Sequence, residues 1–524
     1  MKKSIYILLA AFMMLPAVAS AQQNLRTGYF LDGYIYKYKM NPAMAPERGF
    51  FAMPVLANLS VGAEGNLGLS TFLYPTETGL TTFLSPRVSN ETFLDNISKR
   101  NRFNMNLDMT LFALGFSTGK AYHTVDISMR ADARMNIPGD LLEFMKVGSA
   151  LGNYSWDISN IGVRSSSHVE FAYGYSRSFL DEALRVGARA KLLLGAHRLD
   201  VAMDRMSLEM GEDRWAIESH GNMMMSAPVS FMTNENNKID FLSFDTTDLV
   251  SKLMSPSMGF ALDFGATYDF LDHFTASLSV LDLGAMSWKN TMTAATPETS
   301  WEFEGFESMD MDSIEEQVSG LMTDLTGAFS FEPQEKGLKK AVGLGATIHA
   351  GIEARMPFYD RLSFGMLYTQ RIEKSYSWSE GRIAASVAPL NWLAVTTNYA
   401  ISNFGHSWGG AFNIHLPGFG LFVGFDSFAP LLNVTPQYIP VNSINTNLAL
   451  GINFTFGKYT GRYPKKTATR KTVNKSVSST TIYTSSSSSE TKVTTETPEK
   501  TETAETTETT TIIETNTTVE SVQE

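Results

Sequence analysis

Cysteine is absent from this chain of 524 residues. The absence excludes disulfides, thiolate metal sites and a lipid attached at a cleavage-site cysteine. Long hydrophobic runs are also missing: after Gln22 no stretch approaches the ~18 consecutive apolar residues of a transmembrane helix. Charged residues make up only 18% of the chain, whereas 43% of it is hydrophobic. The order of the apolar residues therefore has to reveal the fold.

Motifs of known catalytic chemistry are missing too. The chain has no Gly-x-Ser-x-Gly elbow, no His-Glu-x-x-His helix and no phosphate loop, and its 8 histidines do not have metal-ligand spacing. We therefore expect no enzyme activity, no cofactor, no metal and no nucleic-acid partner.

The N-terminus has the order of a secretory signal peptide. Lys2 and Lys3 precede an apolar run from Ile5 to Val18, and the small residues Ala19-Ser20-Ala21 follow. A membrane anchor is the alternative, but the run is shorter than the ~20 residues that a spanning helix needs. We predict that residues 1–21 are a signal peptide cleaved after Ala21 and that the protein is exported.

Strict alternation of apolar and polar residues recurs along the chain. In GFALDFGATYDF the apolar positions Phe260, Leu262 and Phe264 alternate with small or acidic ones, so each set lies on one face of a strand. Similar runs occupy residues 125–133, 169–175, 184–196, 342–356, 362–368 and 447–456. Clusters of turn residues at 269–273 and 357–361 predict tight turns between such runs.

These runs predict an all-β protein, a transmembrane antiparallel β-barrel of about 14 strands between residues 50 and 458. A soluble β-sandwich or propeller also alternates and is the competing fold. The last run, ending Gly451-Ile452-Asn453-Phe454-Thr455-Phe456, resembles the C-terminal assembly signal of outer-membrane barrels. This resemblance implies the cell outer membrane as location, with its lipids and the barrel assembly machinery as partners.

Three segments interrupt the alternation with helix-like spacing: 139–153, 246–254 and 312–329. We predict that they are elements of extracellular loops, because the loops on that side of such barrels are the longer ones.

The C-terminal segment has the composition of a disordered chain. From Thr472 to Glu524, 27 of 53 residues are Ser or Thr, and apolar residues are too few to build a core. We predict that residues 459–524 form a disordered tail in the periplasm, either as a solvated tether or in contact with a periplasmic partner.

The polar face of the strands would line the lumen with charges of both signs. Paired charges in a narrow barrel normally satisfy one another, so most of these residues are interpreted as structural. The basic residues Arg185, Arg189 and Lys191 are the best candidates for contact with an anion. The other candidate lumen contacts are His349, Glu353 and Arg355.

The stretch YKYKMNPAMAPERGFF contains Asn41-Pro42-Ala43 directly before the first strand. This arrangement resembles the FadL-like superfamily of long-chain fatty-acid transporters, and especially outer-membrane proteins of Bacteroidota within it. The resemblance implies that residues 22–49 form a hatch, a segment folded into the barrel lumen. Pro42 fixes its own φ and the Asn41 side chain can close a local turn, which suits a sharp reversal in a confined space. An ordinary turn into the first strand is the alternative.

Aromatic and basic residues surround the motif. We expect Tyr29, Phe30, Tyr34, Tyr36 and Tyr38 to pack against the inner wall, and Lys37, Lys39 and Arg48 to pair with acids of the lumen.

The resemblance implies that the barrel transports or captures a hydrophobic small molecule. The long Ser/Thr/Glu-rich tail departs from a plain transporter. The alternative function is therefore that of an interaction or scaffold protein, such as a component of a secretion system.

Overall fold

A computed structural model describes residues 24–46, 48–53, 57–76, 79–147, 154–210, 215–247, 249–296, 299–303, 330–427 and 445–457. The chain divides into two units, Met1–Tyr463 and Pro464–Glu524, and all of the described residues lie in the first. The predicted signal peptide, the predicted loop element at 312–329 and the predicted tail lie outside the described residues. Among the described residues, no helix is both long enough and apolar enough to cross a membrane.

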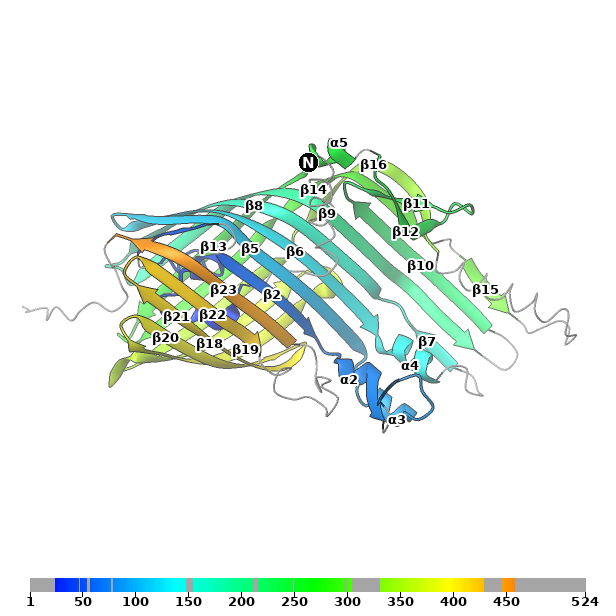
Figure 1. The fold of residues 1–524 in the computed structure, drawn as a ribbon, viewed down its shortest axis with the longest axis horizontal. Coiled ribbons are helices and arrows are strands. Elements are labelled where there is room, and N and C mark those ends of the chain that lie inside the picture. Colours follow the sequence, from blue (N-terminus) through cyan, green and yellow to red (C-terminus); the bar gives the residue numbers. More distant parts are fainter. Residues whose placement is uncertain are drawn as a thin grey trace, which may run out of the picture. The chain divides into compact units, whose positions relative to one another are not determined.

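The strands of the first unit form an antiparallel wall that closes on itself (Figure 1). In ring order the wall consists of β1 (Gly49–Ala52) with β2 (Asn58–Gly65), β5 (Arg100–Thr118), β6 (Ala121–Pro138), β8 (Ile161–Phe179), β9 (Leu184–Met210), β13 (Ser257–Phe270), β14 (Phe274–Ala295), β17 (Ala346–Met356), β18 (Tyr359–Ile372), β19 (Trp378–Leu390), β20 (Leu393–Ser402), β21 (Gly405–Leu416), β22 (Phe419–Ser427) and β23 (Asn445–Phe456).

Closure follows from the pairing of the first and last strands. Gly49 of β1 lies opposite Phe456 of β23, and Val61 of β2 lies opposite Leu448. Because β1 and β2 occupy one position between β5 and β23, the ring has 14 positions. The prediction of a closed barrel of about 14 strands is confirmed, and the absence of a free edge satisfies the backbone hydrogen bonds that lipid cannot.

Alternate side chains of the wall face opposite environments. Burial alternates residue by residue along β20 and through the middle of β18, with every second side chain exposed. The exposed positions carry large apolar side chains, among them Phe260, Phe364, Met366, Tyr399 and Ile401. The outer face is therefore apolar, as a membrane-spanning wall requires.

The two ends of the barrel differ in their connections. At one end, here called the short-turn end, two or a few residues join the strands, for example between Phe270 and Phe274 and between Met356 and Tyr359. These two turns were predicted. The long-loop end carries the helices α2 (Leu69–Phe72), α3 (Asn90–Leu94), α4 (Gly139–Val147) and α5 (Leu249–Leu253), the hairpins β3–β4 (Leu73–Thr76, Gly79–Thr82) and β11–β12 (Ser230–Thr233, Ile239–Asp245), and β7 (Tyr154–Asp157).

Helices α4 and α5 lie within the predicted segments 139–153 and 246–254. The region with α2, β3, β4 and α3 was not predicted, because its elements are only four or five residues long. They pack around buried Phe93 and Phe83.

One wall position is shared by two strands. The part of β9 nearer the short-turn end, Leu184–Gly195, pairs with β13. The part nearer the long-loop end, Arg198–Met210, pairs with β10 (Trp215–Ser226). Likewise β14 pairs first with β17 and then with β16 (Glu332–Gly343). The prediction of one continuous strand over 342–356 was wrong, because the run is broken at Leu344 and Gly345. Strand β15 (Thr299–Phe303) extends the sheet beside β10.

The hatch lies inside the barrel, as the resemblance implied. It contains two short 3-10 helices, η2 (Arg26–Tyr29) and η3 (Ile35–Lys39). Its apolar side chains, including Leu25, Tyr29 and Tyr36, form a common buried cluster with Phe50 and Phe422 of the wall. Since each of these five side chains is at most 1% exposed, the hatch provides the core of the lumen.

Candidate functional site

Arg26 anchors the first turn of the hatch to the wall. Its guanidinium pairs with three carboxylates: Glu64 of β2, Glu380 of β19 at 3.2 Å and Asp426 of β22 at 3.7 Å. Burial alone would lower the pKa of Arg26, but the three carboxylates outweigh that effect and raise it. The neighbouring residue strengthens the anchor, since the Thr27 amide donates to Asp426 Oδ1 at 2.7 Å.

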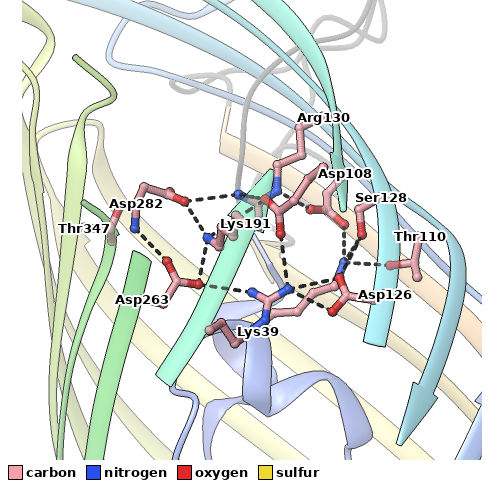
Figure 2. A network of polar contacts seen from close by, with 12 residues as sticks. Lys39, Asp108, Thr110, Asp126, Ser128, Arg130, Lys191, Asp263, Asp282 and Thr347 are labelled. Atoms are coloured by element: carbon pink, nitrogen blue, oxygen red, sulfur yellow. Dashed lines mark hydrogen bonds and ion pairs between the residues drawn. The ribbon is translucent and has the colours of Figure 1, made fainter. Parts of the chain in front are cut away.

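Lys39 anchors the last turn of η3. Its ammonium group donates to Thr110 Oγ1 and Ser128 Oγ at 2.7 Å each and lies 3.3 Å from Asp108 Oδ1 (Figure 2). The Lys39 side chain is 0% exposed, so all three N–H groups need partners within the protein. The predicted pairing of Lys39 with an acid of the lumen is confirmed.

The wall beside Lys39 carries a connected network of buried charges (Figure 2). Arg189 binds Asp126, Glu170 and Asp263, with distances of 2.9, 3.1 and 3.1 Å. Lys191 binds Asp263 at 2.7 Å and Asp282 at 2.6 Å. Arg130 links this network to the Lys39 anchor, because its Nε lies 3.2 Å from Asp108. Buried charges are tolerated when they are paired in this way.

The Asn41-Pro42-Ala43 turn is held by backbone and side-chain hydrogen bonds. Asn41 Oδ1 accepts from the Ala43 amide at 3.0 Å, which closes the local turn. Asn41 Nδ2 donates to the carbonyls of Ala266 and Leu278 at 3.3 Å each. One asparagine side chain therefore shapes the turn and attaches it to β13 and β14.

Two paired glycines form the seat for this turn. Gly187 of β9 lies opposite Gly265 of β13 in the strand register. A Cβ at Gly187 would lie 2.4 Å from the carbonyl carbon of Pro42, and a Cβ at Gly265 would lie 2.1 Å from Asn41 Oδ1. Both distances are shorter than non-bonded contacts allow. The turn therefore fits against the wall only because both positions lack a side chain.

The aromatic residues of the hatch pack as predicted. Phe30 is 5% exposed, and Tyr29, Tyr34, Tyr36 and Tyr38 are at most 3% exposed. Tyr36 Oη donates to the Ala57 carbonyl at 2.6 Å, and Tyr29 Oη donates to Ser277 Oγ at 3.0 Å. Burial, aided by nearby carboxylates, raises the pKa of Tyr34, Tyr36 and Tyr38 well above the usual tyrosine value.

The candidate lumen contacts fall into two groups. Arg189 and Lys191 are at most 1% exposed and already paired with carboxylates, whereas Arg185 is partly exposed near the short-turn end, as is Arg355. His349 and Glu353 of β17 are buried. The His349 Nδ1 lies 3.0 Å from Thr369 Oγ1, and its ring lies 6.0 Å from that of Tyr29. The structure thus brings Arg189 and Lys191 into one network through Asp263.

Sequence reasoning missed Arg26 and the glycine seat. The sequence did contain a signal for Gly187 and Gly265. Each is a glycine at a position that faces the lumen in a strand of alternating apolar and polar residues. No local signal marks Arg26, because its partners come from strands far apart in the chain. Among the described residues, no group of His, Asp or Glu side chains is placed to hold a metal ion.

The described lumen holds small polar cavities. One of ≈ 30 Å³ is lined by Arg26, Arg134, His349, Arg371 and Trp378, among others, and another of ≈ 40 Å³ lies beside Arg130. A third, of ≈ 10 Å³, lies next to the Arg26 anchor. Since one water needs ~10–15 Å³ of such space, these cavities have room for a few waters.

Residues 42–426 match the model of a family described as a family of unknown function (DUF5723). The chain belongs to this family. No curated protein matches the chain significantly.

Several solved structures are similar to the chain. A Pseudomonas aeruginosa FadL homologue has 9% identity and a TM-score of 0.39, with 84% of this chain and 100% of that chain covered. The Ralstonia pickettii toluene transporter TbuX has 10% identity and a TM-score of 0.38, covering 81% and 94%. The P. putida toluene transporter TodX has 7% identity and a TM-score of 0.36, covering 80% and 93%. Similarity at this level carries no conclusion about function.

Proposed function

We propose that this member of DUF5723 is an outer-membrane transporter for hydrophobic small molecules, plugged by its own hatch. In this proposal the long-loop end is extracellular and the short-turn end periplasmic, as in outer-membrane barrels generally. The hatch withdraws to let a solute pass. A single observation carries the proposal: besides its apolar contacts, the hatch covers buried acids and amides of the wall.

These polar groups matter because a hatch that never leaves the lumen would be expected to bury apolar side chains of both the hatch and the wall. Here the hatch covers acids and amides of the wall, including Asp108, Glu380, Asn398 and Asp426, which are at most 3% exposed. Such groups are costly to bury and favourable to hydrate. When the hatch leaves, water can replace it and the barrel remains stable, since the wall satisfies its own backbone hydrogen bonds.

An apolar cluster at the long-loop end supports the hydrophobic substrate class. It contains five buried methionines and several aromatic and branched residues from β7, β9, β10, β14 and the β11–β12 hairpin. Its methionines are Met203, Met206, Met223, Met225 and Met292. Methionine is flexible and adapts to apolar ligands of different shape. An apolar solute arriving from outside would be captured here before it reaches the lumen.

A reversible lock on the hatch tests this function. Asn398 Nδ2 donates to Thr27 Oγ1 at 2.8 Å, so cysteines at these two positions lie close together. Because the chain has no other cysteine, Thr27→Cys with Asn398→Cys yields one possible disulfide. We expect cells whose outer membrane contains the reduced variant to take up the apolar probe phenylnaphthylamine faster than cells without the protein, and oxidation to remove this difference.

The single variants Thr27→Cys and Asn398→Cys are the controls. Each lacks one of the original side chains but has only one cysteine, so oxidation cannot form the disulfide that locks the hatch. Uptake that is equally fast in the oxidised and reduced double variant would contradict movement of the hatch.

The second candidate function is that of an interaction or scaffold protein, such as a component of a secretion system. The observation that favours it is the firm attachment of the hatch, which is anchored by buried charges at Arg26 and at Lys39. In that case the predicted tail, residues 459–524, would contact a periplasmic partner. Uptake of the probe that is no faster than in cells without the protein, in either redox state, would favour this function over transport.

A further inference from the structure

The connection between β18 and β19 crosses the mouth of the lumen at the long-loop end. This connection, residues 373–377, is called the strap and contains the 3-10 helix η4 (Lys374–Tyr376). Its backbone carbonyls accept hydrogen bonds from strands on another side of the ring: Ser377 O from Arg102 Nη1 of β5 at 2.7 Å, and Ser375 O from Asn136 Nδ2 of β6 at 3.3 Å. The strap therefore spans from β18 and β19 to β5 and β6.

One carboxylate fastens the strap. Glu373 binds Arg134 of β6, Arg164 of β8 at 3.2 Å and Arg371 of β18 at 3.0 Å. Burial alone would raise the pKa of Glu373, but the guanidinium groups of Arg134 and Arg371 outweigh burial and hold it below the usual value. Glu373 thus remains charged at neutral pH and connects three strands through ion pairs.

One aromatic residue seals the strap against the wall. Tyr376 is 5% exposed, and the Arg164 guanidinium lies 4.6 Å from the centre of its ring. A Cβ at Gly162 of β8 would lie 2.5 Å from Tyr376 Oη, so the hydroxyl occupies space that a missing side chain leaves. The preceding Lys374 has a φ of 46°, in the left-handed region that is uncommon for lysine. Tertiary contacts, rather than local preference, hold this conformation.

The ≈ 30 Å³ cavity described above is lined by Arg371 and Trp378, which flank the strap on either side. Its lining joins the strap side, at Trp378, to the first residues of the hatch, Asn24 and Arg26. The Arg26 guanidinium lies 5.1 Å from the centre of the Trp378 ring. Asn106, also in the lining, is 1% exposed, and its Oδ1 and Nδ2 have no hydrogen-bond partner among the described residues. The cavity therefore has room and polar partners for a water between the strap side and the hatch.

We propose that the strap is a second gate, in series with the hatch, which opens when Glu373 leaves its three arginines. This proposal rests on the proposed function in one respect, namely that solutes pass through the lumen. A hatch alone would leave the cavity and Asn24 open to the exterior. In this proposal the strap covers both, and its attachment across the lumen depends on the side chains of Glu373 and Tyr376 and on two backbone carbonyls. Release of Glu373 removes the only ion pairs that the described strap makes with β6 and β8.

Labelling of a single cysteine tests this gate without any transport measurement. Asn104 of β5 is 6% exposed and lines the cavity beneath the strap, so Asn104→Cys reports access to it. Asn236, in the exposed turn of the β11–β12 hairpin, gives the matched control Asn236→Cys. Folded protein in liposomes is treated from outside with a bulky, membrane-impermeant maleimide, in the parent and in the Glu373→Gln background. The faster-running band before boiling confirms folding in each case.

In the parent background we expect the maleimide to label Asn104→Cys at least tenfold more slowly than Asn236→Cys. Glu373→Gln should raise the labelling rate of Asn104→Cys at least tenfold and leave that of Asn236→Cys unchanged. If Glu373→Gln does not fold, Tyr376→Ala serves as the second opening variant. Asn104→Cys that reacts as fast as the control in the parent, or equally slowly with an opening variant, would overturn the gate. This experiment tests the gate independently of the proposed transport, because labelling does not require a solute to cross the barrel.

Discussion

At the scale of single residues, Arg26 is the centre of the attachment between hatch and wall. It brings together carboxylates from β2, β19 and β22. Without it, Arg382 is the cation that the described residues would leave beside Glu380 and Asp426. Removing one partner of a buried ion pair typically costs about 3–5 kcal/mol, because the remaining charges are left uncompensated. Arg26 is therefore one of the strong attachments of the hatch.

Arg26→Leu should accordingly weaken the docking of the hatch by about 3–5 kcal/mol while the barrel stays folded. The released hatch should be cut by trypsin at Lys37 or Lys39, at a protease concentration that leaves the parent intact. Arg177→Leu, which changes an exposed arginine of β8, is the matched control and should behave like the parent. Equal resistance of Arg26→Leu and the parent would show that the ion pairs do not hold the hatch.

The hatch tyrosines predict a loss of docking at alkaline pH. Their pKa values lie above the usual tyrosine value of 10.0 when the hatch is docked. The released hatch therefore loses protons first, and stability falls as pH rises above about 10. We expect tyrosinate absorbance to rise in a cooperative step together with release of the hatch. Replacing Tyr34, Tyr36 and Tyr38 by Phe should remove that step, and an unchanged titration curve would contradict the assignment.

At the scale of elements, the paired strands β9 and β13 form the seat for the Asn41-Pro42 turn. Gly265→Val should push the turn away from the wall, since even its Cβ would overlap Asn41 Oδ1. Overpacking of this kind typically costs about 1–3 kcal/mol. Gly381→Val is the control, because a Cβ there meets nothing within 4 Å. We expect only Gly265→Val to make the hatch sensitive to trypsin; resistance of both variants would exclude a role for the seat.

Sequence patterns predict the elements of the wall better than the contacts inside it. The strand β13 is predicted by period-two order, and the turns after Phe270 and Met356 by clusters of turn residues. Both signals depend only on residues that are neighbours in the chain. The sharing of one wall position by β10 and β13 is not visible in the sequence, because register depends on partner strands. The pairing of Arg26 with Glu380 and Asp426 is likewise tertiary, since about 350 or more residues separate the partners.

At the scale of the whole molecule, the barrel has a closed polar lumen within an apolar outer face, and the hatch fills that lumen. Deleting residues 24–47 removes the cations Arg26, Lys37 and Lys39. Glu64, Asp108, Glu380 and Asp426 remain in the wall, where they lose a cationic partner. A ring of acids in a water-filled pore favours cations. The open pore should therefore conduct and should prefer potassium to chloride.

Conductance of the protein in planar bilayers under a potassium chloride gradient tests the central claim most directly. We predict that the variant lacking residues 24–47 stays heat-modifiable, conducts more than the intact protein and shows a reversal potential shifted toward that of potassium. Adding Glu373→Gln should raise the conductance further by opening the strap. A variant lacking residues 464–524 is the control and should match the intact protein. A folded hatch-deleted barrel that conducts no more than the intact protein would contradict the claim that the hatch plugs the lumen.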